Sequence, residues 1–346
     1  MCNIAGYTGN RKAAPILIDM IKRQEYLDGG LSTGIATICD GKLYYAKVTG
    51  NCDELIKKTD ALNFPGTCGI IHSRPDDNYV EYAHPFVCED NKTAVVCNGN
   101  MCTDEILATI RNSLVRFLEY NENIKFKSEM KFQESSYPQL KNGNYVAYGE
   151  LFARLIGHIR ANTDMDYAET MADVSSKLFS DVVNVLVSAN SPENIYVSRI
   201  SRPMNIMVCE DESYISTSQF GFPSVPNMKY MRTLPQMKSC TISKNGFIES
   251  KYPITGGKVT EYSEEEYMVI KEQLREMLKK ESACMDNMGG GIIPCDRSAD
   301  KLRPNAKLIY DILWNFYNEG VLKSEIKDSS IPWLPGKKVK RKYFCI

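Results

Sequence analysis

The sequence lacks any long hydrophobic run and any charged leader followed by an apolar stretch. Nowhere do about 18 apolar residues follow one another, so we expect neither a membrane-spanning helix nor a secretory signal. An excess of one charge is also missing, because 42 Lys and Arg stand against 43 Asp and Glu. This balance gives no general attraction to nucleic acid or to an anionic membrane. We therefore expect a cytoplasmic protein that binds neither.

Histidine is scarce, and the cysteines are not spaced as metal ligands. His72, His84 and His158 are scattered along the chain, and no Cys-x-x-Cys motif occurs. Structural metal sites need closely spaced ligands, so we predict no metal site and no cofactor. Twelve cysteines in a chain without a leader are more typical of reduced thiols than of a disulfide framework.

The local patterns predict strands and helices in clusters, which is typical of an α+β domain. Asp40-Gly41 and Asn245-Gly246 are turn signals between strand-like runs, so each predicts a hairpin. Further strands are expected at 3–8, 68–73, 93–97, 195–199, 205–209 and 214–217. Helical spacing of apolar residues predicts helices at 13–26, 103–120, 149–161, 166–188 and 305–319.

The last quarter of the chain shows a change in composition. Ser263 and Glu266 form a capping box that begins an amphipathic helix. The glycines at 289–291 follow it, and without a Lys-Ser or Lys-Thr pair they indicate a linker rather than a phosphate-binding loop. We therefore predict a main domain over 2–285 and a small helical appendage over 286–346. The basic stretch 337–342 is expected to be a solvated or partner-facing tail.

Three short segments carry residues suited to amide hydrolysis. Cys2 follows the initiator Met, whose removal would leave a thiol beside a free α-amino group that can act as its base. Asn98 and Gly99 end a buried-type strand, and their amide N–H groups are two donors for an oxyanion. Arg74 ends another strand and can hold a carboxylate by two parallel hydrogen bonds. Taken singly, each has an ordinary structural interpretation: a buried thiol, an Asn-Gly turn and a surface Arg.

The order and spacing of these segments resemble the class II glutamine amidotransferases, most closely the glutaminase domain of glucosamine-6-phosphate synthase. The matching blocks cover roughly residues 2–277: Cys2 to Gly9, Ser32 to Ala36, Lys47 to Gly50, Gly69 to Arg74, Ala83-His84-Pro85, Ala94 to Gly99, Asn194 to Ser201, Tyr214 to Gln219 and Tyr267 to Glu272.

The resemblance implies a four-layer αββα sandwich of the N-terminal-nucleophile hydrolases. It implies Cys2 as nucleophile and base, Asn98 and Gly99 as the oxyanion hole, and Arg74 as the clamp on the glutamine carboxylate. Glutamine would be cleaved through a γ-glutamyl thioester. Because no isomerase domain follows in this sequence, ammonia would pass to a separate synthase or acceptor subunit or be released. A homo-oligomer is compatible with this interpretation.

The expected substrate pocket departs from the family pattern at three places. Arg74 is followed by Pro75 and by Asp76 and Asp77 instead of Trp-Ala-Thr-His-Gly. The family's Asp for the glutamine amino group has no clear counterpart. Tyr148 takes its place beside Glu150, which leaves Asp76, Asp77, Tyr148 and Glu150 as candidate substrate contacts. An Arg expected near position 28 is Asp28.

These departures keep two alternatives open beside a glutaminase or amidotransferase subunit. One is an N-terminal-nucleophile amidase for a different amide. The other is a non-catalytic regulatory protein on the same scaffold.

Overall fold

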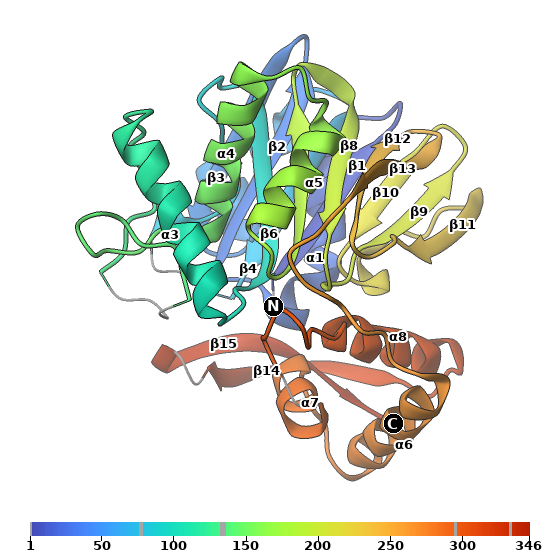
Figure 1. Cartoon of the computed structure of the whole chain (residues 1–346). Helices are drawn as coiled ribbons and strands as arrows, with labels where there is room; N and C mark the ends of the chain where they lie inside the picture. Colours follow the sequence, from blue (N-terminus) through green and yellow to red (C-terminus); the bar gives the residue numbers. More distant parts are fainter. Residues whose placement is uncertain (1, 76–78, 132–135, 294–295, 332–333) are drawn as a thin grey trace.

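Two antiparallel β-sheets form the centre of the molecule (Figure 1). The structure is a computed structural model and describes residues 2–75, 79–131, 136–293, 296–331 and 334–346. The first sheet has the strand order β11 (Met228–Thr233), β9 (Asn205–Cys209), β10 (Ser213–Ser216), β1 (Asn3–Thr8), β4 (Cys68–Arg74), β2 (Ser32–Cys39) and β3 (Lys42–Thr49). The second has the order β13 (Gly246–Pro253), β12 (Lys238–Ser243), β8 (Ser191–Arg199), β7 (Asp181–Ser188), β6 (Thr93–Asn100) and β5 (Phe86–Val87).

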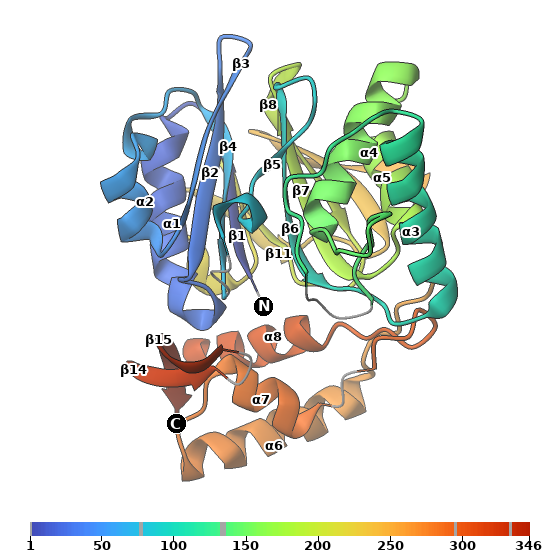
Figure 2. The same ribbon diagram turned by 90° about the vertical axis from the view of Figure 1, so that its left-hand side faces the viewer.

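Helices cover the outer face of each sheet (Figure 2). The first sheet carries α1 (Ala13–Asp28) and α2 (Cys52–Lys58), and the second carries α3 (Glu105–Tyr120), α4 (Tyr148–Asn162) and α5 (Tyr167–Lys177). Short 3-10 helices lie at η1 (Ala61–Asn63), η2 (Val80–Tyr82) and η3 (Gln219–Gly221). The four layers confirm the αββα sandwich that the resemblance implied.

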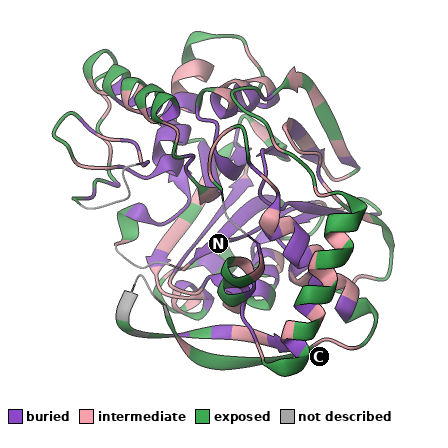
Figure 3. Ribbon diagram, turned by 60° about the horizontal axis from the view of Figure 1, so that its bottom comes forward, coloured by how far each residue is buried: buried purple, intermediate pink, exposed green. Residues whose placement is uncertain are grey.

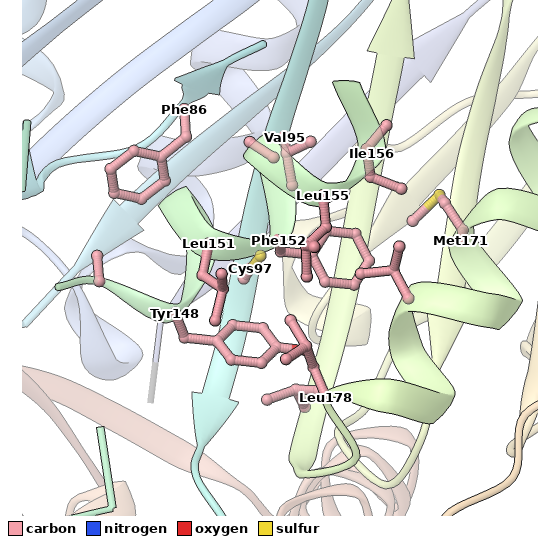
Figure 4. Packing of buried hydrophobic residues seen from close by; sticks show 14 of the residues in the cluster. Phe86, Val95, Cys97, Tyr148, Leu151, Phe152, Leu155, Ile156, Met171 and Leu178 are labelled. Carbon is pink, nitrogen blue, oxygen red and sulfur yellow. The ribbon is translucent and has the colours of Figure 1, made fainter. Parts of the chain in front are cut away.

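Apolar side chains fill the space between the layers. The interface between the sheets includes Ile4, Ile70, Val96 and Val185, all fully buried. A second cluster lies between the second sheet and its helices, where Tyr148, Leu151 and Phe152 pack with Val95 and Cys97 (Figure 4). Burial on both faces explains why the central strands contain few polar residues.

Both predicted hairpins are confirmed. Asp40 and Gly41 have φ angles of 50° and 68° between β2 and β3, which is the left-handed conformation that an Asp-Gly turn supplies. The second hairpin joins β12 to β13 through Lys244 and Asn245, and Gly246 begins β13 opposite Ser243.

The helix predicted over 166–188 is wrong in its second half. α5 ends at Lys177, and β7 runs from Asp181 to Ser188 with every residue buried. A strand buried on both faces is a continuous apolar run, and periodicity alone does not distinguish it from a buried helix. The β-branched residues of this run favour the strand.

The C-terminal part forms a small unit against one end of the sandwich (Figure 1). It contains α6 (Glu264–Lys280), α7 (Met285–Ile292), α8 (Asn305–Asn318) and the hairpin of β14 (Lys323–Ile331) with β15 (Leu334–Cys345). The capping box of Ser263 and Glu266 is confirmed. Leu27 from α1 joins the apolar cluster of this unit with Leu274, Tyr310 and Phe344.

Two sequence-based expectations for this region are wrong. The glycines at 289–291 lie inside α7 and do not form a linker. The basic stretch is part of β15 and not a tail, because Val339 and Arg341 are buried while Lys338 and Lys340 between them are exposed. This alternation with a period of two is the pattern of a half-buried strand. The domain boundary near residue 286 stays a prediction.

Within the described ranges, no helix has the length and apolar character needed to cross a bilayer.

Candidate active site

Cys2 lies immediately before β1, at the end of the sandwich that faces the C-terminal unit (Figure 1). Its side chain is partly exposed. Figure 3 brings this end of the molecule forward and shows that its central strands are buried. Met1, whose removal the sequence predicts, lies outside the described residues.

The backbone nitrogen of Cys2 contacts Asn98 across the two sheets. It donates a hydrogen bond to Asn98 Oδ1 at 2.9 Å. Asn98 is 1% exposed, and its Nδ2 has no hydrogen-bond partner among the described residues. A buried amide donor without a partner is costly, so a native structure that keeps one usually uses it for a ligand or a water molecule. The side-chain carbonyl oxygen of Asn98 therefore holds the nitrogen of Cys2, while the amide Nδ2 of Asn98 remains available as a donor.

Gly99 brings its backbone very close to β7. Its φ angle is 149°, and a Cβ added here would lie 2.0 Å from the carbonyl oxygen of Asp181. Only glycine fits such an approach. The Asn-Gly pair is thus part of β6, where Asn98 pairs with Val183 and Gly99 with Val182, and not an isolated turn.

Arg74 lies at the same end of the first sheet as Cys2. β1 and β4 pair with Asn3 opposite Ser73, so the next position outward brings Cys2 and Arg74 to the same end. Arg74 is 9% exposed. Its Nη1 donates to the carbonyl oxygen of Tyr82 at 2.8 Å, and its guanidinium carbon lies 4.0 Å from the centre of the Tyr82 ring.

Two buried, neutral histidines, His72 and His84, lie next to this end of the sheet. The rings of His72 and His84 lie 4.1 Å apart, and His72 Nε2 is 3.1 Å from the carbonyl oxygen of Cys97, the neighbour of Asn98. Burial, followed by the charge of Arg74, lowers the pKa of His72 to about 3. Burial, followed by His72, also lowers the pKa of His84 well below its usual value. Both rings therefore stay uncharged near neutral pH.

The structure gives the other candidate residues different surroundings. Tyr148 is buried in the core, and its hydroxyl lies 3.5 Å from Asn184 Nδ2 (Figure 4). Burial raises the pKa of Tyr148 well above its usual value, so the phenol stays neutral. Asp76 and Asp77 lie outside the described residues.

The carboxylate of Glu150 is occupied by protein donors. It accepts hydrogen bonds from the backbone nitrogens of Lys127 and Ser128, from the Ser128 hydroxyl and from Arg154 Nη2. Glu150 is 2% exposed. These contacts fix the segment before α4, and none of them joins Glu150 to Cys2 or Arg74.

Asp28, where the resemblance leads one to expect an Arg, is buried at the end of α1. Burial raises the pKa of its carboxyl to about 6. Arg341 of β15 lies 3.8 Å from Asp28 Oδ1. Sequence reasoning missed both Tyr82 and Arg341 as neighbours of the site. The period-two alternation around Val339 was the signal that β15, and with it Arg341, is partly buried.

Over most of its length the chain is similar to known proteins. No family model matches the chain. The isomerizing glutamine–fructose-6-phosphate aminotransferase of Pyrococcus horikoshii is 31% identical over 227 residues, which cover 63% of this chain and 32% of that protein. The enzyme of the same name from Aquifex aeolicus is 28% identical over 262 residues, covering 74% of this chain and 37% of that protein. The chain contains a class II glutamine amidotransferase-type domain.

Solved structures agree on the fold of this amidotransferase-type domain. The glutamine phosphoribosylpyrophosphate amidotransferase of B. subtilis matches with a TM-score of 0.55 and 18% identity, over 73% of this chain and 50% of that chain. The allosteric regulatory enzyme of purine biosynthesis matches with a TM-score of 0.56 and 20% identity, over the same shares. The chain spans about a third of the length of the two aminotransferases described above and half of these two solved chains.

Proposed function

We propose that the chain hydrolyses glutamine to glutamate and ammonia, with Cys2 as the nucleophile after removal of Met1. The observation that carries the proposal is the arrangement of Cys2 and Asn98: one end of the buried amide accepts from the Cys2 nitrogen, and the other end is left as a donor. A nucleophile, a base and an oxyanion donor are the groups that acyl transfer requires.

The proposed reaction proceeds in two steps. The α-amine of Cys2 takes the proton of the thiol, and the thiolate attacks the γ-carbonyl carbon of glutamine. The negative charge on the carbonyl oxygen is stabilised by Asn98 Nδ2 and by the N–H of Gly99. The tetrahedral intermediate collapses with transfer of the proton to the leaving nitrogen, which releases ammonia and leaves a γ-glutamyl thioester. Water then cleaves the thioester to glutamate and restores the thiol.

In this proposal Arg74 binds the α-carboxylate of glutamine. The position of Arg74 beside Cys2 at one sheet edge supports this role. Tyr148 and Glu150 receive no such support from their contacts, and the group that binds the amino end of glutamine remains a prediction of the sequence. Ammonia would pass to a separate acceptor subunit, and a cytoplasmic location belongs to the same proposal.

Arg74→Lys tests the carboxylate clamp. Losses for buried charge pairs run to about 2–5 kcal/mol, and an ammonium does not reproduce the two-pronged geometry of a guanidinium. We expect kcat/KM for glutamine to fall by about 10²-fold, a size that corresponds to roughly 2.7 kcal/mol. The control is Arg154→Lys, because Arg154 is equally buried but pairs with Glu89 and Glu150. That variant should lose stability and keep the KM for glutamine.

The competing function is hydrolysis of a different amide. Because the carboxylate of Glu150 is occupied by protein donors, it does not serve as the contact for the glutamine amino group, and this alternative stays open. Specificity constants for glutamine, its des-carboxy analogue and its des-amino analogue separate the two. If the des-carboxy compound is hydrolysed as well as glutamine, the chain is an amidase for a different amide.

A further inference from the structure

Arg341 is a fully buried cation on the strand nearest the C-terminus. It is 1% exposed, and its Nη1 donates to the carbonyl oxygen of Gly29 at 3.0 Å. Asp28 Oδ1 lies 3.8 Å from Nη2, and Asp286 Oδ2 lies 4.0 Å from Nε. A buried guanidinium needs such partners, because removing a charge from water is costly. β15 thus contributes one specific charged contact to the amidotransferase-type domain.

The turn that Arg341 holds is hydrogen-bonded directly to the strand that carries the proposed clamp. The nitrogen of Gly30 donates to Ser73 Oγ at 2.8 Å, and the nitrogen of Leu31 donates to the carbonyl oxygen of Arg74 at 3.0 Å. Gly29 also lies against this strand, because a Cβ on it would come within 2.7 Å of Ser73 Oγ. Displacement of the turn would therefore move the end of β4.

The same turn is close to the residue that follows the nucleophile. Asn3 Nδ2 donates to the carbonyl oxygens of Gln24 and Glu25 at 2.8 and 3.2 Å, in the last turns of α1. A Cβ on Gly29 would also lie 2.8 Å from Asn3 Nδ2. The turn after α1 thus contacts both the start of β1 and the end of β4. Cys2 precedes β1, and Arg74 ends β4.

The C-terminal unit faces this end of the sandwich in both side views. α8 and β15 are the elements of that unit next to the sandwich (Figures 1 and 2). Lys342, next to Arg341, reaches the carbonyl oxygen of Arg23 on α1 at 3.4 Å. Gln219 Nε2 adds a contact to Asp311 on α8 at 2.9 Å. The contact of Arg341 is therefore part of a continuous junction between the two units.

We propose that Arg341 is a positioning residue for glutamine hydrolysis. Through this residue the C-terminal hairpin supports the active site without contacting the substrate. Arg341 fixes the turn at 28–31, and the turn fixes Cys2 and Arg74 relative to each other. The inference rests on the proposed glutaminase function. Positional errors of about 1 Å cost on the order of 10² in rate, so loss of this support should lower kcat substantially.

The test compares Arg341→Lys and Arg341→Met with Lys340→Met, a matched variant of the exposed neighbour on the same strand. We expect kcat for glutamine, per folded molecule, to fall by about 10²-fold in Arg341→Met and less in Arg341→Lys, since lysine keeps the charge. Lys340→Met should match the wild type. Arg341→Met removes the guanidinium 3.8 Å from the buried Asp28 carboxyl, so Asp28→Asn with Arg341→Met is the version that removes both charges together if the single variant does not fold.

Hydrogen exchange adds a readout that does not depend on catalysis. The amides of Gly30 and Leu31 should exchange faster in both Arg341 variants than in Lys340→Met. Unchanged exchange, or an unchanged kcat in variants that lose only melting temperature, would overturn the proposal. If the wild type does not hydrolyse glutamine, the proposed function fails. The rate of Cys2 alkylation by iodoacetamide then tests whether Arg341 positions Cys2. A change in this rate that both Arg341 variants share and Lys340→Met lacks supports the positioning role, and equal rates in all variants refute it.

Discussion

Cys2→Ala is expected to abolish glutamine hydrolysis and to leave the fold intact. Removal of a catalytic nucleophile from another hydrolase costs on the order of 10⁶ in kcat. Cys2 precedes β1 and is partly exposed, so its sulfur contributes little to the core, and we expect a stability change of about 1 kcal/mol or less. The measurements are release of glutamate and ammonia together with the melting temperature.

The control for this variant is Cys39→Ala. Cys39 is also a partly exposed thiol, at the end of β2 next to the Asp40-Gly41 turn. Its removal should leave the rate unchanged. Protein isolated with Met1 retained should be inactive, because its Cys2 nitrogen is an amide without basicity. Full activity of that form would show that the α-amine is not the base.

Asn98→Ala is expected to lower kcat by about 10²–10³ with little change in KM, as the loss of an oxyanion donor does in other enzymes. Asn98→Asp separates the two ends of the side chain. The aspartate can still accept from the Cys2 nitrogen but has no amide donor, so kcat should fall here too. Its negative charge also raises the pKa of the neighbouring amine. Because the neutral amine is the base, the acidic limb of the pH profile should move to higher pH.

Asn184→Ala provides the matched control for Asn98. Asn184 is fully buried in the adjacent strand β7, where its Nδ2 lies 3.2 Å from Ser198 Oγ. This variant should lose stability and keep its rate per folded molecule. If Asn98→Ala behaves in the same way, the Asn-Gly pair has a structural role only and the proposed oxyanion hole is wrong.

The sequence predicted the fold best where local chemistry and tertiary packing favour the same structure. The turns at Asp40-Gly41 and Asn245-Gly246 need left-handed residues, and the capping box at Ser263 satisfies its own helix end, so both are visible locally. β7 was missed because burial on both faces removes the alternation that identifies a strand. The glycines of α7 were assigned to a linker because the packing of Met285 and Met288, which supports that helix, is not visible in local sequence.

The resemblance named Cys2, Asn98 and Arg74 as site residues, and their catalytic roles stay predictions. The structure brings Cys2 beside Asn98 and to the same end of the first sheet as Arg74. The stacking of Arg74 on Tyr82 and the burial of Arg341 against Gly29 join residues 8 and 312 positions apart. The alternation around Val339 indicates that Arg341 is buried, but no short-range pattern names the partner in either contact. The contacts of Glu150 likewise depend on a loop whose course only the folded chain defines.

Reaction with a glutamine-like diazoketone, followed by intact mass and peptide mapping, tests whether Cys2 is the nucleophile. We expect a chain without Met1 that gains one adduct, located on Cys2, and that glutamine protects from labelling. Cys2→Ala should gain none. Labelling of a chain that retains Met1 at the same rate, or an adduct on another cysteine with Cys2 unmodified, would contradict the assignment of Cys2 as the nucleophile.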